Sequence, residues 1–344
     1  MNELMRKLGI DVPIIQAGMA GGITTPDMVA AVSEAGALGT IGAGYMRDAA
    51  LKADIQAIRQ ITDKPFAVNV FAVDLQTFSD DIAPMQQFLN HYRDELEIDA
   101  GEASINVHDY LQEKIEVIID ENIPVVSTAF GVLPAVLIER LKQHDVTLIG
   151  MATNLEEAKQ LEVAGYDAVV AQGMEAGGHR GTFDVEKYPN GCQIGLHVLV
   201  QELLDRVSLP VIAAGGIYGK SQVDALLGMG AAAVQLGTRF LVAQEAGTNM
   251  AYRQALMKAH TMDTVVTNVF SGRPARAVRN RFVVEVEASE IAPKPFPVQN
   301  QMTKPIRSAA KKYDIPDLQS LWAGQGVGAI HKEESVAEIV GALI

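Results

Sequence analysis

Residues 167–181 read DAVVAQGMEAGGHRG, and this stretch is the part of the chain that says most about the fold and the chemistry. Its first five residues form an apolar run typical of a buried parallel strand. The glycines that follow permit positive φ angles and let the backbone approach a ligand closely. His179 lies among them, and histidine changes its charge near neutral pH. The stretch predicts a strand-end loop that holds a cofactor and places a base beside it. The alternative is a tight turn with His179 facing solvent.

Seven more apolar runs alternate with helix-like segments along the chain. Because parallel strands are buried on both faces, such runs are apolar throughout. Eight of them with helices between predict an α/β fold of the (β/α)8 TIM-barrel class rather than a doubly wound sheet. The expected strands lie at residues 12–16, 37–41, 66–70, 124–128, 146–150, 167–171, 210–214 and 232–236.

Signals for helix starts and stops between these runs support the barrel. Thr25 followed by Pro26 predicts an N-cap and a first helical turn, and Gly36 marks the helix end. Asn154 with Glu157 resembles a capping box. A helix that stops at glycine before a strand recurs, as repeated βα units would leave, at residues 35–38, 164–169 and 229–234.

Two stretches break the alternation. Residues 71–112 are polar and predict an elaborated loop with some helix. Residues 241–308 follow the last strand and are rich in proline, which predicts a lid or substrate-binding domain over the barrel mouth. The barrel would then comprise residues 1–240 and 309–344. We expect the arginines of this lid to form salt bridges with nearby glutamates. The arginines are Arg273, Arg276, Arg279 and Arg281, and the glutamates are Glu285, Glu287 and Glu290.

Composition excludes several classes of partner. The net charge of −14 argues against nucleic acid, whose affinity for proteins comes mostly from clustered Lys and Arg. The single cysteine, Cys192, cannot form an intramolecular disulfide, which favours a reducing compartment. The amino terminus shows no secretory signal, and the uncharged run at 123–138 is too short and proline-interrupted to span a membrane. A cytoplasmic protein with neither nucleic-acid nor membrane partners is expected.

Amide side chains and glycines gather at the carboxyl ends of the predicted strands, where barrel enzymes place their sites. Amides offer both donors and acceptors, so the set suits a neutral heteroaromatic ring. The residues at these strand ends are Gln16, Ala17, Gly18, Met19, Asn69, Gln172, Gly215, Gly216, Gln235, Gly237 and Thr238.

The glycines after strands seven and eight lie where these barrels usually cradle a phosphate, because backbone N–H groups there favour an anion. One glycine pair alone is often just a turn. Both together favour a phosphate-bearing cofactor, and FMN fits the barrel, the amides and the cradle. The remaining histidines are scattered without metal-ligand spacing, so no metal site is predicted.

Two charged residues of the histidine loop have more than one interpretation. Glu175 is either an acid/base residue or an acceptor for backbone amides that shapes the loop. Arg180 either holds an anionic substrate, lowers the pKa of His179 by like charge, or is a solvated arginine.

The chain resembles the class I nitronate monooxygenases, formerly called 2-nitropropane dioxygenases, nearly from end to end. The glycine–histidine string is shared with a sister group, the flavin-dependent enoyl-ACP reductases, whereas Arg180 and the Trp322 segment look more like the monooxygenases. One departure is Tyr218-Gly219-Lys220, where relatives often have an Asp-Gly pair. The resemblance is carried by residues 13–21 (PIIQAGMAG), 39–45, 68–71, 171–182, 210–217, 235–238, 270–272 and 322–325.

This resemblance implies FMN-dependent oxidation of alkyl nitronates, such as the toxic propionate 3-nitronate. The oxidant would be O2, the route a flavin semiquinone, and the products carbonyl compounds plus nitrite or related nitrogen oxides. It implies that His179 is the active-site histidine. It also implies that FMN contacts Asn69, Gln172, Gly177, Gly216, Gln235, Leu236, Gly237 and Thr238.

Several alternatives stay open at this point. His179 either holds the nitro oxygens when protonated or takes the α-proton of a neutral nitroalkane when neutral. The alternative function is an NAD(P)H-dependent flavin enoyl-ACP (thioester) reductase, and a third is a flavin-binding or sensing protein without turnover. No heptad seam or isolated apolar face indicates an interface, so a homo-oligomer is neither predicted nor excluded.

Overall fold

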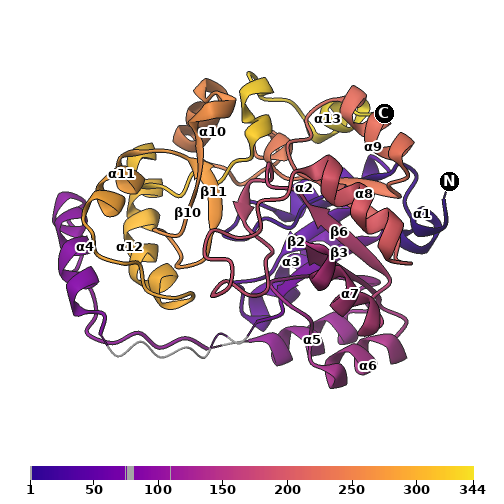
Figure 1. Ribbon diagram of the computed structural model, residues 1–344, viewed down its shortest axis with the longest axis horizontal. Coiled ribbons are helices and arrows are strands. Elements are labelled where there is room, and N and C mark those ends of the chain that lie inside the picture. Colours follow the sequence, from indigo (N-terminus) through magenta and orange to yellow (C-terminus); the bar gives the residue numbers. More distant parts are fainter. Residues whose placement is uncertain (1, 74, 76–80, 109) are drawn as a thin grey trace.

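The computed structural model of the protein describes residues 2–73, 75, 81–108 and 110–344. Eight parallel strands form a nearly closed barrel with helices around it, which confirms the predicted (β/α)8 fold (Figure 1). Their order in the sheet is β1-β9-β8-β6-β5-β4-β3-β2. The circle closes between β1 and the start of β2, where Ile15 forms a parallel bridge with Leu38.

Each predicted apolar run overlaps one of these strands, as expected for segments buried on both faces. The observed strands are β1 (Ile14–Gln16), β2 (Gly39–Gly42), β3 (Phe66–Phe71), β4 (Val125–Ala129), β5 (Thr147–Ala152), β6 (Ala168–Gln172), β8 (Val211–Ala214) and β9 (Ala233–Leu236).

The helices around the barrel begin where the capping signals predict. The Thr25 hydroxyl accepts a hydrogen bond from Met28 N at 3.1 Å, and the Asn154 side chain accepts one from Glu157 N at 2.9 Å. The barrel helices are α2 (Pro26–Glu34), α3 (Asp48–Arg59), α5 (Leu111–Asp120), α6 (Ala135–Gln143), α7 (Leu155–Val163), α8 (Leu196–Arg206), α9 (Lys220–Met229) and α13 (Val336–Gly341).

Side chains that alternate along each strand divide the core into an inner and an outer layer. On β6, Ala168 and Val170 belong to the cluster inside the barrel, whereas Val169 and Ala171 pack against the surrounding helices. Helix α1 (Glu3–Leu8) adds its apolar side chains to the inner cluster. Lys7 on α1 pairs with Asp167, just before β6, so α1 covers the amino end of the barrel and leaves the carboxyl end open.

A smaller unit covers the open end of the barrel. Its three-stranded antiparallel sheet has the order β10-β11-β7, and β7 is part of the loop that follows β6. Aromatic side chains dominate its core, where the rings of Phe270 and Phe282 stack at 4.8 Å. The elements of the unit are β7 (Gly178–His179), β10 (Thr264–Thr267), β11 (Ala275–Val278), α10 (Met250–Lys258), α11 (Arg281–Ala288) and α12 (Val298–Lys312). Short 3-10 helices lie along the same part of the chain, namely η1 (Thr238–Phe240), η2 (Thr261–Asp263), η3 (Pro316–Leu318) and η4 (Gln325–Ala329).

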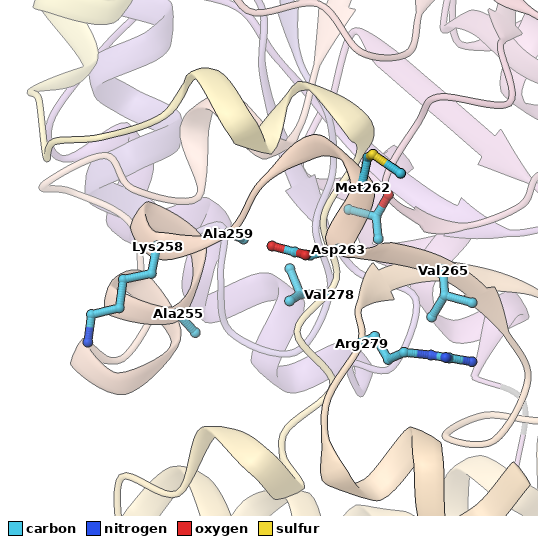
Figure 2. A pocket seen from close by; sticks show the side chains of 9 residues that line it. Ala255, Lys258, Ala259, Met262, Asp263, Val265, Val278 and Arg279 are labelled. Carbon is cyan, nitrogen blue, oxygen red and sulfur yellow. The ribbon is translucent and has the colours of Figure 1, made fainter.

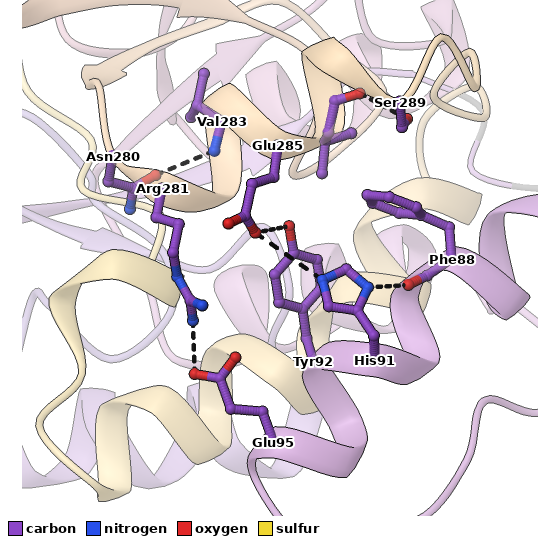
Figure 3. Close-up of polar contacts among 10 residues, drawn as sticks. Phe88, His91, Tyr92, Glu95, Asn280, Arg281, Val283, Glu285 and Ser289 are labelled. Carbon is purple, nitrogen blue, oxygen red and sulfur yellow. Dashed lines mark hydrogen bonds and ion pairs between the residues drawn. The ribbon is translucent and has the colours of Figure 1, made fainter.

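Helix α4 (Ala83–Glu95) lies with the smaller unit, far from the barrel strands that precede and follow it in sequence (Figure 1). Tyr92 packs its ring 4.9 Å from Phe282 and donates a hydrogen bond to Glu285 of α11 at 2.8 Å (Figure 3). Arg281 of α11 pairs with Glu95 at 2.6 Å. The predicted boundary at residues 241–308 stays a prediction, and we propose that the unit also includes α4 and the whole of α12.

The salt bridges expected within the lid are found in part. Arg279 pairs with Glu287 at 2.9 Å, as predicted, whereas the partner of Arg281 comes from α4 instead of the lid. Arg273 and Arg276 form no ion pair with any described carboxylate. Within the same described ranges, no helix has both the length and the apolar character needed to cross a bilayer.

Candidate active site

A cavity of about 1090 Å³ lies between the carboxyl ends of the barrel strands and the smaller unit. It is lined from the barrel side by the strand-end loops and from the opposite side by α12 and the Trp322 segment. All the predicted site residues except Gln16 line it, namely Ala17, Gly18, Met19, Asn69, Gln172, Gly177, His179, Gly215, Gly216, Gln235, Leu236, Gly237 and Thr238.

Gln16 lies beneath the cavity instead of in its wall. Its side chain is fully buried, accepts a hydrogen bond from Thr40 N at 2.9 Å, and donates to the carbonyl of Ala17. Gln16 therefore supports the loop of residues 17–22 from behind. Side chains alternate along β1, with Ile14 in the outer cluster and Ile15 in the inner one, so Gln16 faces away from the barrel interior.

The loops after β8 and β9 have the features of a phosphate cradle. Gly216 has a φ of +64°, and an added Cβ there would lie 3.1 Å from the Cβ of Glu175. The backbone N–H groups of Gly216, Gly237 and Thr238 donate to no acceptor within the described part of the chain. Three such amides beside one cavity fit an anionic group, because buried N–H groups in folded proteins are nearly always paired.

Amide side chains line the same cavity. Gln172 donates to the carbonyl of His179 at 3.0 Å and accepts from Gly181 N at 2.8 Å, so its amide holds the histidine loop at both ends. Asn69 donates to the Ser127 hydroxyl at 2.9 Å, which leaves its carbonyl oxygen for a ligand. Of the amides predicted to contact a heteroaromatic ring, Asn69, Gln172 and Gln235 line the cavity.

His179 is held between the barrel and the smaller unit. It lies on β7, where it is paired with Ala275 of β11, and its side chain reaches the cavity. Its Nε2 atom lies 2.8 Å from the Ser271 hydroxyl, and its ring centre lies 5.2 Å from that of Trp322. The alternative of a solvent-facing turn is wrong for this residue.

Burial lowers the pKa of His179 to about 3, and the nearby positive charges of Arg273 and Arg307 add to this effect. The imidazole is therefore neutral near pH 7. A neutral imidazole can accept a proton, and it cannot hold an anion by charge.

The lining of the cavity is cationic although the whole protein is acidic. No Asp or Glu of the described residues lines it. Its basic side chains are Arg47, Lys114, Arg239, Lys304, Arg307 and Lys311. Arg239 is neutralised by Glu334. Most of the other basic side chains belong to the β2–α3 loop or to one face of α12. Sequence reasoning missed these residues, because no motif joins residue 47 to the helix at 298–312.

Arg307 is held in place by hydrogen bonds within α12. It donates to Thr303 Oγ1 at 3.2 Å and to the carbonyl and side-chain oxygens of Asn300 at 2.9 and 2.8 Å. It forms no ion pair with a carboxylate of the described residues, and burial lowers its pKa. Partial burial of a cation that has no described counter-ion is costly, so the site favours an anionic ligand.

The two residues with open interpretations are both structural in their contacts. Arg180 is fully buried and donates to the carbonyls of Gly173 and Gln172 at 2.8 and 3.0 Å, so it is not a solvated arginine. Burial, followed by repulsion from Arg276, lowers the pKa of Arg180 to about 10. Glu175 accepts from Leu196 N at 3.1 Å and thereby caps the start of α8, as the loop-shaping interpretation expects.

A second hollow, of about 670 Å³, lies on the outside of the smaller unit between α10 and β10 (Figure 2). Lys258, Asp263 and Arg279 line it, and none of the predicted site residues does. Across the described ranges of the chain, no group of three or more His, Cys, Asp or Glu side chains is arranged to hold a metal ion.

The fold and the cavity together define a barrel enzyme whose site faces the carboxyl ends of the strands and is covered by a second unit. The chain belongs to the nitronate monooxygenase family, because the family model described as "Nitronate monooxygenase" matches residues 2–344. A relative from Staphylococcus aureus (strain JH9), described as "Probable nitronate monooxygenase", is 43% identical over 325 residues. The match covers 94% of this chain and 91% of the relative.

Solved structures agree with this assignment. A nitroalkane oxidase from Streptomyces ansochromogenes is 37% identical with a TM-score of 0.93, and the match covers 99% of this chain and 96% of that one. FabK from Thermotoga maritima is 31% identical with a TM-score of 0.78, and the match covers 100% and 94% of the two chains. The protein is therefore an oxidoreductase of a flavin-dependent family that acts on a small-molecule substrate.

Proposed function

We propose that the protein binds FMN and oxidises alkyl nitronates, such as propionate 3-nitronate, with O2. The observation that carries the proposal is the cavity lining, which combines an amide cradle for a phosphate with several cations and no carboxylate of the described residues. A nitronate is an anion, so it matches this lining.

The residues present fit FMN at both of its ends. The N–H groups of Gly216, Gly237 and Thr238 would hold the phosphate, where backbone amides stabilise negative charge. Asn69 and Gln235 would contact the ring system between the cradle and His179. When bound, the flavin supplies the electron transfer and the reaction with O2, and the protein supplies position and electrostatics.

Arg307 is the residue to which we assign the nitronate oxygens. Its guanidinium lines the cavity, and Thr303 and Asn300 hold it in place, so little side-chain entropy is lost when an anion binds. The charge of Arg307 lies near enough to His179 to help lower the pKa of its imidazole, so an anion bound by Arg307 would lie near that ring. Phe130 and Trp322, whose rings lie 5.7 and 5.2 Å from that of His179, exclude water from this side.

Two measurements on the purified protein test the proposal. Incubation with FMN should give a yellow protein that keeps its flavin through gel filtration, and ethylnitronate should then drive O2 uptake without a pyridine nucleotide. A protein that stays colourless after incubation with FMN would refute the assignment of the cradle. A yellow protein that is inert toward nitronates would refute the substrate.

The similarity to FabK keeps a second candidate, an NAD(P)H-dependent enoyl-thioester reductase. Steady NADH oxidation that depends on crotonyl thioester, with no nitronate-dependent O2 uptake, would favour it. The two assays use the same holoenzyme, so one preparation discriminates between the functions.

A further inference from the structure

A buried hydroxyl lies directly behind the candidate active-site histidine. Ser271 is in the turn between β10 and β11, is only 1% exposed, and does not line the cavity. Its Oγ lies 2.8 Å from Nε2 of His179. The proposed function gives this serine no role.

The hydrogen bonds of Ser271 decide which ring nitrogen carries the proton. A hydroxyl has one proton to donate. Ser271 directs its proton to the carbonyl of Arg273 at 3.1 Å, and no other described residue donates to that carbonyl. If the hydroxyl donated to His179 instead, the buried carbonyl would lose its donor. The arrangement that satisfies all three groups is Nε2–H to Oγ and Oγ–H to the carbonyl.

The opposite ring nitrogen of His179 is then an unprotonated base. Among the described residues, Nδ1 has no hydrogen-bond partner, and the side chain to which it belongs lines the cavity. Pairing of β7 with β11 and the bond to Ser271 hold the ring from two sides. The lone pair on Nδ1 is thus free to accept a proton from a bound molecule.

We propose that Ser271 is a positioning residue that keeps the proton of His179 on Nε2, so that Nδ1 takes the α-proton of a neutral nitroalkane. The inference rests on the proposed function and concerns its proton-transfer step, in which a neutral nitroalkane becomes the nitronate. Ser271 acts through His179 and does not touch the substrate.

The step balances without an oxidant or reductant. The bond between the α-carbon and its hydrogen breaks, and the proton forms an N–H bond at Nδ1. The electron pair left on carbon forms the C=N bond, while one N–O π pair moves onto oxygen and gives the nitronate. The new negative charge develops near Arg307, and the imidazolium that forms beside it is stabilised by that same charge.

The test compares a neutral nitroalkane with its preformed anion. Holoenzyme in D2O under nitrogen should exchange the α-hydrogens of nitroethane for deuterium. Proton NMR measures this exchange as the loss of the α-hydrogen signal. In air, O2 uptake is measured separately with nitroethane and with ethylnitronate. Ser271→Ala should slow the exchange and nitroethane oxidation by about 10- to 100-fold, the size expected for a misplaced catalytic group. Ethylnitronate oxidation should stay within about 3-fold, since it needs no proton transfer.

The matched control is Ser289→Ala. Its hydroxyl also bonds backbone in the smaller unit, donating to the Val286 carbonyl at 2.8 Å, but it does not line the cavity. This variant should behave as wild type with both substrates. An equal fall of both activities in Ser271→Ala would show a structural role and overturn the inference, as would unchanged exchange. If the wild type oxidises ethylnitronate but exchanges no deuterium, this inference fails alone. If it oxidises neither, the proposed function fails.

Discussion

Replacing Arg307 by methionine tests whether this side chain binds the nitronate. Methionine keeps much of the length and removes the charge. The three hydrogen bonds that fix the guanidinium are accepted by Thr303 and Asn300 of the same helix. A hydrogen bond to a charged group contributes about 1.5–3 kcal/mol. At about 1.4 kcal/mol per tenfold, the expected loss in kcat/KM for ethylnitronate is roughly 10- to 150-fold.

The kinetic form of this loss is also specified by the structure. Arg307 would contact an anion that is already charged in the ground state, so the loss should fall mainly on KM, with kcat changing little. O2 uptake over a range of ethylnitronate concentrations separates the two constants. Flavin absorbance in the same samples reports whether the cofactor is still bound.

Lys312→Met is the matched control for Arg307→Met. It removes the same charge from the same helix, but Lys312 does not line the cavity. Its KM should stay within about 2-fold of the wild-type value, as is usual for surface charges. The reasoning is refuted if Arg307→Met leaves KM unchanged with flavin fully bound. It is also refuted if Lys312→Met raises KM as much, because the effect would then come from overall charge.

Three further predictions follow from the same site. His179→Asn should lower nitroethane oxidation by about 10²–10⁴-fold while FMN stays bound, and an unchanged rate would remove the residue from the chemistry. Because the pKa of His179 is lowered to about 3, the imidazole stays neutral as pH falls, so kcat/KM for nitroethane should be flat between pH 8 and 5. An unperturbed histidine would lose about 30-fold by pH 5, and such a fall would show that the residue titrates normally. Gly216→Val should weaken FMN binding at least about 10-fold, measured by fluorescence titration, because a β-branched residue disfavours a φ of +64°. Gly219→Ala in the same loop, where an added Cβ meets nothing within 4 Å, should bind FMN normally, and equal losses would contradict the cradle.

The positions of the barrel strands could be predicted because each strand is buried on both faces. The run at 167–171 contains no polar side chain after Asp167, and only the interior of a parallel sheet selects for that pattern. Capping residues such as Thr25 act within four residues of chain, so their effect is also visible locally. Interactions between residues close in sequence determine where a single helix or strand begins and ends.

The place of α4 was beyond such reasoning. Its sequence neighbours are β3 and α5 of the barrel, yet Tyr92 packs against Phe282, a residue almost two hundred positions away. Nothing in the spacing of the residues around 71–112 says which of several apolar surfaces a helix will cover. The position of the helix depends on which of these surfaces its apolar side chains fit best in the folded chain.

By itself, the sequence determined the (β/α)8 fold and the strand-end residues that line the cavity, because strand burial and glycine-rich turns leave local patterns. The folded structure alone decided the protonation and the charge of the site. His179 is neutral because burial and the charges of two arginines in the smaller unit lower its pKa. Ser271, which contacts its ring, belongs to a turn 92 residues further along the chain. Electrostatic energies depend on distance through space and on the exclusion of water, and neither is written in the order of residues.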